Sequence, residues 1–209
     1  MTNTKPILFH AYSGTLGGSE KILLDLLRRL RRPAVLACPP GPLADAAEGD
    51  GITLFRLAER PLAARGGVRP VSAMANIIGH GREVKDLTED IEPALVLSWG
   101  MRSAIASTTV MRSRTVPIVA EHVDLLPPGR QGDIARKALL RCDRVVCLSN
   151  SIARDLDPAW HASGRVTVVH PGVDLPDMPD PIHPVPARVL VLAAIEEWKG
   201  QHLALEAIA

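Results

Sequence analysis

Short runs of consecutive apolar residues alternate with longer amphipathic stretches along most of this chain. A strand with one solvated face alternates apolar and polar residues, so consecutive apolar residues indicate strands buried on both faces. Amphipathic helices between such strands are typical of a parallel sheet that is covered on both sides. The sequence therefore predicts an α/β fold, a Rossmann-like doubly wound parallel sheet of six or seven strands, over residues 1–172.

The predicted elements follow from these patterns. Strands are expected at residues 6–11, 34–38, 52–57, 94–98, 117–121, 144–148 and 166–170. Helices are expected at residues 42–49, 71–91, 101–112, 132–141 and 149–156, and Ser149 is a typical N-cap. One more helix follows the first strand, because an apolar stripe runs through Ile22, Leu23, Leu26, Leu27 and Leu30.

A proline-rich stretch separates this region from the end of the chain. Proline at that density excludes a central strand or a helix interior, so residues 173–187 are predicted to form an extended linker. Residues 188–193 are strand-like, and residues 201–209 begin an apolar-periodic helix without a C-cap signal. Residues 188–209 are therefore expected to be the first strand and helix of a truncated second domain.

Composition excludes several classes of partner. Lys and Arg total 24 against 23 Asp and Glu, and aromatic residues make up 3%, so no nucleic-acid partner is expected. No apolar run approaches the length of a transmembrane helix or of a signal peptide's core. The arginine cluster at residues 28–32 leaves peripheral membrane contact open, although capping of the preceding helix explains it better.

The cysteine pattern indicates a reducing, cytoplasmic location. Cys38, Cys142 and Cys147 are odd in number and irregularly spaced, which does not fit a disulfide framework. No cysteine or histidine spacing suggests a metal site, so no metal is predicted. Neither GxSxG nor HExxH occurs, and hydrolase and metalloprotease activities therefore have no support.

A glycine-rich turn from Gly14 to Glu20 lies between the first predicted strand and helix. In an open parallel sheet, ligands bind beyond the carboxyl ends of the strands, where a helix N-terminus offers N–H groups to an anion. Glycine lets a phosphate or a sugar approach the backbone closely. The structural alternative has Ser19 as the N-cap and Glu20 in the first helical turn, and the local sequence does not decide between the two.

Polar and aromatic residues also end two neighbouring central strands. Glu121 and His122 end one of them, and Trp99 ends the strand before it. A histidine at this edge is suited to orienting a hydroxyl or accepting a proton near neutral pH. The structural alternatives are a loop histidine bonded to a nearby carboxylate and a tryptophan packed in the core.

Four segments, in order along the chain, resemble retaining glycosyltransferases of the GT-B fold, family four. GTLGGSEK resembles the GG-x-E loop that opens the first helix of that family. Residues 142–149, followed by Asp155-Leu156, resemble its "aDrvia-S…dL" segment, and residues 166–175 resemble its "i-VipNGVDl" exit from the first domain. Residues 189–209, with Lys199-Gly200, resemble the opening of its second domain.

The resemblance implies an enzyme with two Rossmann-like domains. Residues 1–172 would be the acceptor-binding domain, and residues 188–209 would open the donor-binding domain. The implied reaction transfers a sugar from a nucleotide-sugar donor, a substrate rather than a cofactor, to a sugar or small-molecule acceptor, with retention of configuration.

The resemblance also implies roles for individual residues. The backbone of Gly17 and Gly18 would approach the donor diphosphate or the reacting sugar. His122 would be the catalytic residue that contacts the transferred sugar, and Lys199 would neutralise the departing diphosphate. Ser19, Trp99 and Glu121 are expected to line the acceptor cleft because of their positions at the predicted carboxyl edge of the sheet, and not because of the resemblance.

Departures from the family pattern keep other functions open. Ala193-Ala194 stand where the family has Gly-Arg, His170-Pro171 replace the family's Asn, and the family's nucleoside pocket falls beyond residue 209. We therefore expect the 209 residues alone to be inactive. One alternative is a non-catalytic glycan-binding or partner subunit that self-associates or is completed by a second chain. The other is an enzyme similar to nucleotide-sugar 2-epimerases, which the GG-x-E loop and the Lys199-Gly200 segment disfavour.

Overall fold

A computed structural model describes residues 4–60, 70–112, 115–173, 190–193, 195 and 197–208. Its internal contacts divide the chain into two compact units, Met1–Gly172 and Val173–Ala209. The first unit holds the sheet and the glycine-rich turn, and each unit is described by itself.

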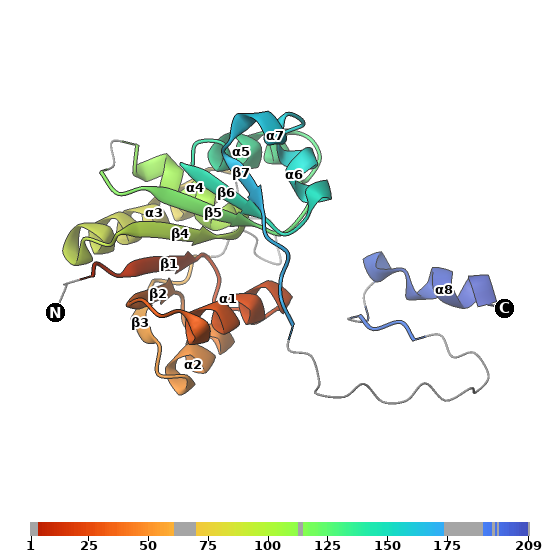
Figure 1. The fold of residues 1–209 in the computed structure, drawn as a ribbon, viewed down its shortest axis with the longest axis horizontal. Coiled ribbons are helices and arrows are strands. Elements are labelled where there is room, and N and C mark those ends of the chain that lie inside the picture. Colours follow the sequence, from red (N-terminus) through yellow and green to blue (C-terminus); the bar gives the residue numbers. More distant parts are fainter. Residues whose placement is uncertain are drawn as a thin grey trace. The chain divides into compact units, whose positions relative to one another are not determined.

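The first unit is built on one parallel sheet of seven strands in the order β3-β2-β1-β4-β5-β6-β7 (Figure 1). The strands are β1 (Ile7–Ala11), β2 (Ala34–Cys38), β3 (Thr53–Arg56), β4 (Leu95–Trp99), β5 (Ile118–His122), β6 (Arg144–Cys147) and β7 (Val166–Val168). This sheet confirms the predicted Rossmann-like α/β fold, and each strand lies within two residues of its predicted bounds.

Helices cover both faces of the sheet. The first face carries α1 (Gly18–Arg29) and α2 (Pro42–Gly49), and the second carries α3 (Pro70–Ile91), α4 (Gly100–Val110) and α5 (Arg130–Leu139) (Figure 1). The last connection holds α6 (Asn150–Leu156) and α7 (Trp160–Ser163), of which α7 was not predicted. Ser149 caps α6 as predicted, because its side chain accepts the backbone N–H of Ile152 at 3.3 Å.

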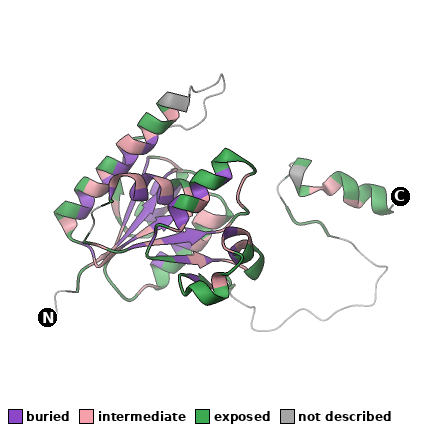
Figure 2. Cartoon of the chain, turned by 90° about the horizontal axis from the view of Figure 1, so that it is seen from above, coloured by how far each residue is buried: buried purple, intermediate pink, exposed green. Residues whose placement is uncertain are grey.

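The two larger apolar cores lie on opposite sides of the sheet, and a small third cluster contains Tyr12, Ile77 and Ala106. The strands between the helices are largely buried (Figure 2). Phe9 and Leu36 pack with Leu23 of α1 on the first side. Leu8 and Val96 pack with α3 and α4 residues on the second side. Adjacent residues of one strand therefore enter different cores, which explains why the strands have consecutive apolar residues.

The strand order reverses direction at β1, which pairs with β2 on one edge and with β4 on the other. The chain leaves β1 for α1 on the first face and leaves β4 for α4 on the second face. In doubly wound sheets, such a reversal opens a crevice at the carboxyl ends of the two strands, where ligands bind. The residues that follow β1, β4 and the adjacent β5 are therefore the first candidates for a site.

In the described part of the second unit, the predicted helix is present and the predicted strand is not. Residues Gln201–Ile208 form α8, after a 3-10 turn at Glu197–Lys199. Residues 190–193, the described part of the predicted strand at 188–193, are not in a strand, and Leu192 is 91% exposed. A strand requires backbone hydrogen bonds to a neighbouring strand, and an apolar sequence does not supply them. Apart from Val173, the predicted linker at 173–187 lies outside the described residues.

The described helices include none that is both long enough and apolar enough to cross a membrane.

Candidate active site at the carboxyl edge of the sheet

The glycine-rich turn delivers the chain from β1 into α1 through Gly17, the N-cap of the helix. The Glu20 carboxylate reaches back and accepts the backbone N–H of Gly17 at 2.9 Å. The structural alternative in which Ser19 caps α1 is therefore wrong. The Ser19 hydroxyl instead accepts the indole N–H of Trp99 at 2.7 Å, which ties the first turn of α1 to the end of β4.

At two positions of this turn, glycine is explained by different physical features of its surroundings. A Cβ on Gly14 would lie 2.3 Å from the backbone oxygen of Pro40, so the packing of this turn against residues 39–40 requires glycine. A Cβ on Gly18 would meet nothing within 4 Å. Gly18 opens the first turn of α1, where backbone N–H groups have no acceptor within the helix. The space at Gly18 and these N–H groups suit close contact with an anionic ligand.

Glu121 lies on the same side of the sheet as this turn. It pairs in register with Trp99, so its side chain leaves β5 towards the face that α1 covers. Its side chain is buried, and neither carboxyl oxygen makes a hydrogen bond. Burial, together with the negative charges of Asp124 and Glu20, raises its pKa from 4.5 to about 8. The Gly100 backbone amide, which does not reach hydrogen-bonding geometry, offsets part of this rise in pKa.

His122, the next residue, faces the other side of the sheet. It pairs in register with Cys147, which belongs to the second core. Its side chain is 0% exposed, so it does not line an open cleft in this domain, and its contact with the transferred sugar stays a prediction. Neither ring nitrogen has a hydrogen-bond partner, and burial lowers its pKa against the opposing effect of Asp124 and Asp155.

The structure thus separates the three residues predicted to line the acceptor cleft from the predicted catalytic histidine. Ser19, Trp99 and Glu121 lie together beside the glycine turn, on the α1 side. His122 lies across the sheet from them, because neighbouring residues of one strand point to opposite faces. Lys199 belongs to the second unit, so its place in a common site with Gly17 remains a prediction.

A buried polar network on the second face was missed by the sequence analysis. The ring Nδ1 of His10 lies 3.1 Å from the hydroxyl of Ser107, and Ser98 donates to the same hydroxyl at 3.0 Å. One helical turn earlier, the hydroxyl of Ser103 accepts the backbone N–H of Tyr12 at 2.9 Å. The available signals were a histidine within an apolar strand and two serines four residues apart on α4.

His80 of α3 extends this network through ring contacts. Its ring centroid lies 4.4 Å from that of Tyr12 and 4.9 Å from that of His10. Burial lowers the pKa of His80 to about 4 and also lowers the pKa of His10, so both rings are neutral at physiological pH. The network therefore holds α3 and α4 against the end of β1 without buried histidine charges.

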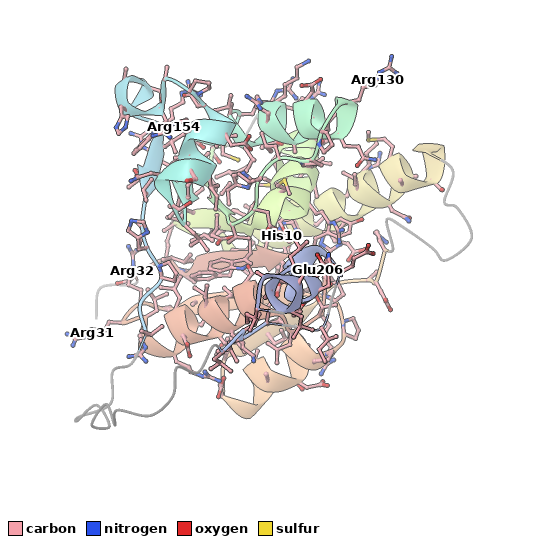
Figure 3. All side chains as sticks on the ribbon, turned by 90° about the vertical axis from the view of Figure 1, so that its right-hand side faces the viewer. His10, Arg31, Arg32, Arg130, Arg154 and Glu206 are labelled. Atoms are coloured by element: carbon pink, nitrogen blue, oxygen red, sulfur yellow. The ribbon has the colours of Figure 1, made fainter. Side chains whose placement is uncertain are left out.

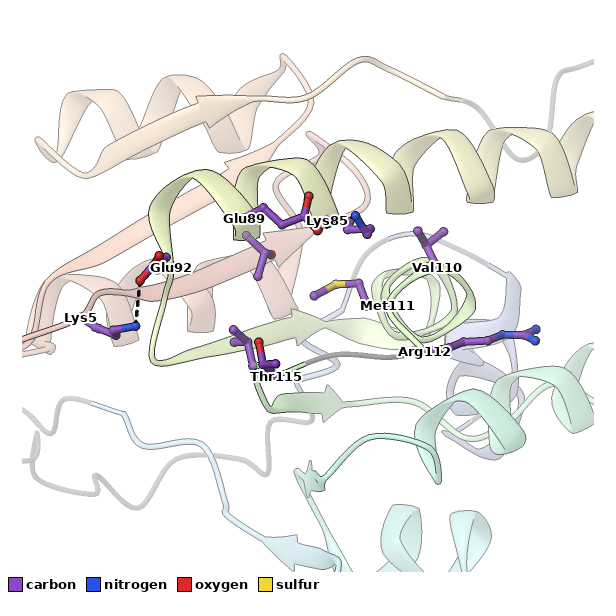
Figure 4. Close-up of a pocket in the computed structure, with 10 residues that line it drawn as sticks. Lys5, Lys85, Glu89, Glu92, Val110, Met111, Arg112 and Thr115 are labelled. Atoms are coloured by element: carbon purple, nitrogen blue, oxygen red, sulfur yellow. Dashed lines mark hydrogen bonds and ion pairs between the residues drawn. The ribbon is translucent and has the colours of Figure 1, made fainter.

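A hollow of about 540 Å³ opens at the opposite, amino-terminal edge of the strands (Figure 4). Its rim carries two ion pairs, Lys5 with Glu92 at 3.1 Å and Lys85 with Glu89 at 2.6 Å. This hollow lies at the opposite end of the strands from the glycine turn. The charges of its two ion pairs compensate each other, so the rim attracts a charged ligand only weakly.

In the part of the chain that the structure describes, the remaining charged groups do not form a second candidate site. His10 lies within the fold, whereas Arg31, Arg32, Arg130 and Arg154 lie at its periphery (Figure 3). Among the described residues, no group of three or more His, Cys, Asp or Glu side chains could hold a metal ion.

The raised pKa of Glu121 predicts a measurable dependence of stability on pH. The folded protein keeps the Glu121 proton up to about pH 8, whereas an unfolded glutamate releases it near pH 4.5. This proton stabilises the fold below pH 4.5, and its contribution is lost as the pH rises through 8. Wild type should therefore lose stability relative to Glu121→Gln between these values, in urea unfolding at a series of pH values. Removal of an exposed carboxyl by Glu89→Gln is the control, and an equal slope for both variants would contradict the prediction.

Comparison with known proteins places this geometry in a family. The profile described as Glycosyltransferase Family 4 matches residues 16–176. Curated proteins give no sequence match. The structure of HepE from Anabaena in complex with UDP and glucose shares 19% identity and a TM-score of 0.64, and the match covers 81% of this chain and 45% of HepE.

Two further solved structures share the fold. The lipopolysaccharide outer core galactosyltransferase WaaB, in its apo form, has 13% identity and a TM-score of 0.65, over 87% of this chain and 50% of WaaB. UDP-N-acetylglucosamine 2-epimerase from Rickettsia bellii has 16% identity and a TM-score of 0.52, over 79% of this chain and 44% of the epimerase. The present chain thus spans about half the length of these proteins or less. Because the family profile covers most of the sequence, the chain belongs to glycosyltransferase family 4.

Proposed function

We propose that this chain provides the acceptor-binding half of an enzyme that transfers a sugar from a nucleotide-sugar donor to an acceptor, with retention of configuration. The observation that carries the proposal is the first turn of α1, where Gly18 leaves open space beside N–H groups without helical acceptors, at the switch between β1 and β4. Membership of the family supports it, as does HepE, whose structures contain UDP-glucose or UDP and glucose.

The geometry suggests how the turn assists the reaction. When the glycosidic bond breaks, the leaving diphosphate gains negative charge, which fixed N–H donors stabilise best. The Gly17 N–H is already held by Glu20, so the amides that follow it, beginning with Gly18, are those that would face the ligand. The partial positive charge at the start of α1 adds to this stabilisation. Lys199 would neutralise the diphosphate from the donor-binding side.

The proposed domain roles follow the sequence boundaries. Residues 1–172 would bind the acceptor, residues 173–187 would link the domains, and residues 188–209 would open the donor-binding domain. We also propose that the protein is located in the cytoplasm and makes peripheral contact with a membrane. Its second domain would be completed either by self-association or by a second chain. The epimerase alternative is weaker, because the family profile describes glycosyltransferases.

The open space at Gly18 predicts a separation of binding from folding. Gly18→Val should leave the melting temperature nearly unchanged, because its Cβ meets no protein atom. Its branched side chain should weaken binding of the donor by blocking approach to the backbone. Gly14→Ala is the matched control and should lower the melting temperature, because its Cβ would overlap the Pro40 oxygen. In an active protein that contains this domain, calorimetry with nucleotide sugars and thermal unfolding test both variants, and undiminished donor binding by Gly18→Val would refute the role of this turn.

The catalytic role of His122 is best tested by a substitution that keeps this buried position filled. His122→Ala would leave a cavity in a fully buried site, so loss of activity could reflect loss of folding. His122→Leu keeps the volume and removes two nitrogens that lack partners. In an active protein that contains this domain, the proposed contact of His122 with the transferred sugar would be lost, so we expect turnover to fall on the order of a hundred- to a thousand-fold with the melting temperature maintained. Full turnover in His122→Leu would show that the histidine is structural.

The length of the chain predicts weak donor binding. The match to HepE covers 45% of that protein, and we expect the 209 residues alone to show no transfer and to bind nucleotide sugars only weakly. Calorimetry with a panel of nucleotide sugars measures this directly. A dissociation constant in the low micromolar range for the 209-residue chain would show that the donor site lies within these residues.

A further inference from the structure

The carboxyl group of Glu121 is a buried polar group without a partner. Its residue is 4% exposed, and neither oxygen makes a hydrogen bond. Most buried polar side-chain atoms in folded proteins have a partner, and an unpaired one destabilises the fold. A leucine or methionine would satisfy the packing at this position without that cost. The group therefore calls for an explanation outside the packing of the domain.

The charged and polar groups around this carboxyl determine which class of ligand it can bind. Glu20 of α1 and Asp124 of the loop after β5 both act on it with negative charge, and the Gly100 amide at the start of α4 acts in the opposite sense. A phosphate held by Glu121 would be repelled by both acidic neighbours. A metal ion lacks support, because no group of three ligands is assembled among the described residues. A neutral group that both donates and accepts hydrogen bonds remains, and a sugar hydroxyl is such a group.

The position of Glu121 points to the glycine turn. Its strand partner Trp99 holds Ser19 in the first turn of α1 through the 2.7 Å indole hydrogen bond. Glu20, whose charge acts on Glu121, holds the N–H of Gly17 at 2.9 Å. The carboxyl group and the N-terminus of α1 thus belong to one small region, with an anion-binding helix end beside a group suited to a hydroxyl.

We propose that Glu121 is a sugar-binding residue, whose carboxyl group holds a hydroxyl of the sugar at the glycine turn and so contributes to sugar specificity. This inference rests on the proposed transferase function. At neutral pH the carboxyl keeps its proton, so it donates through O–H and accepts through C=O, and it adds no charge beside the diphosphate. The hydroxyl could belong to the donor sugar or to the acceptor, and the test below distinguishes them.

The test compares three variants of the 209-residue chain by protein-observed NMR titration, which measures millimolar affinities. Glu121→Gln keeps a donor and an acceptor in nearly the same shape, and Glu121→Met keeps the length but neither group. Glu89→Gln, at the opposite edge of the sheet, is the control for loss of a carboxyl. The probes are glucose 1-phosphate as the donor-type sugar, methyl glucoside as the acceptor-type sugar, and inorganic phosphate as the probe without sugar.

Glu121→Met should weaken binding of one sugar probe by roughly tenfold and leave phosphate binding unchanged. Loss confined to glucose 1-phosphate assigns the hydroxyl to the donor, and loss that includes methyl glucoside assigns it to the acceptor. Glu121→Gln should stay within about threefold of wild type, and Glu121→Met should melt no lower than wild type. Wild-type sugar affinity in a folded Glu121→Met would overturn the inference alone. A wild-type chain that binds none of the three probes would count against the proposed function itself.

Discussion

The pairing of β1 with two parallel neighbours is the constraint on which the rest of this structure depends. Parallel strands cannot be joined by tight turns, so each connection must cross over the sheet, and most of them do so through a helix. Because β1 pairs with β2 on one edge and with β4 on the other, the crossovers after β1 and β4 cover opposite faces. Leu8 and Phe9, side by side on β1, are buried in different cores for this reason. The crevice at the end of β1 is a consequence of this topology, whatever residues line it.

The same geometry governs which functional groups can meet. Side chains alternate along each strand, so two adjacent polar residues at a strand end serve opposite faces. Glu121 joins Trp99 and the first turn of α1, whereas His122 faces the second core beside Cys147. A substrate at the glycine turn therefore lies on the side of Glu121. Glu121 therefore faces the side of the sheet on which the glycine turn lies. From their adjacent positions in the sequence alone, Glu121 and His122 were equally good candidates for a site at this turn.

Much of the fold could be predicted because its determinants are local. Consecutive apolar residues marked the inner strands, and the apolar stripe of α1 marked the first helix. The two edge strands, β3 and β7, have polar residues among their apolar ones. The predictions failed where a distant partner decides the outcome. Residues 190–193 have a strand-like sequence but no strand. The hydrogen bond between Ser19 and Trp99 joins residues 80 positions apart, and that between His10 and Ser107 joins residues 97 positions apart. For the site residues, the alternation of side chains along a strand could have predicted only that Glu121 and His122 face opposite sides of the sheet.

The unpaired groups at the carboxyl edge have a common physical meaning. Glu121 and His122 are both buried and both lack hydrogen-bond partners, and burial shifts the pKa of each towards its neutral form. Such groups destabilise the folded domain, since an apolar side chain of similar volume would avoid the loss of hydration. Elsewhere on the second face, His10 Nδ1, Ser98 and Ser107 are paired, whereas His10 Nε2 and both ring nitrogens of His80 lack partners. Sites that bind a substrate commonly sacrifice stability in this way, because a group already satisfied by the protein has less to gain from a ligand. Unpaired buried groups are therefore not confined to the strand end, and the position of Glu121 beside Trp99 and the glycine turn is what favours the strand end as the proposed place of substrate binding.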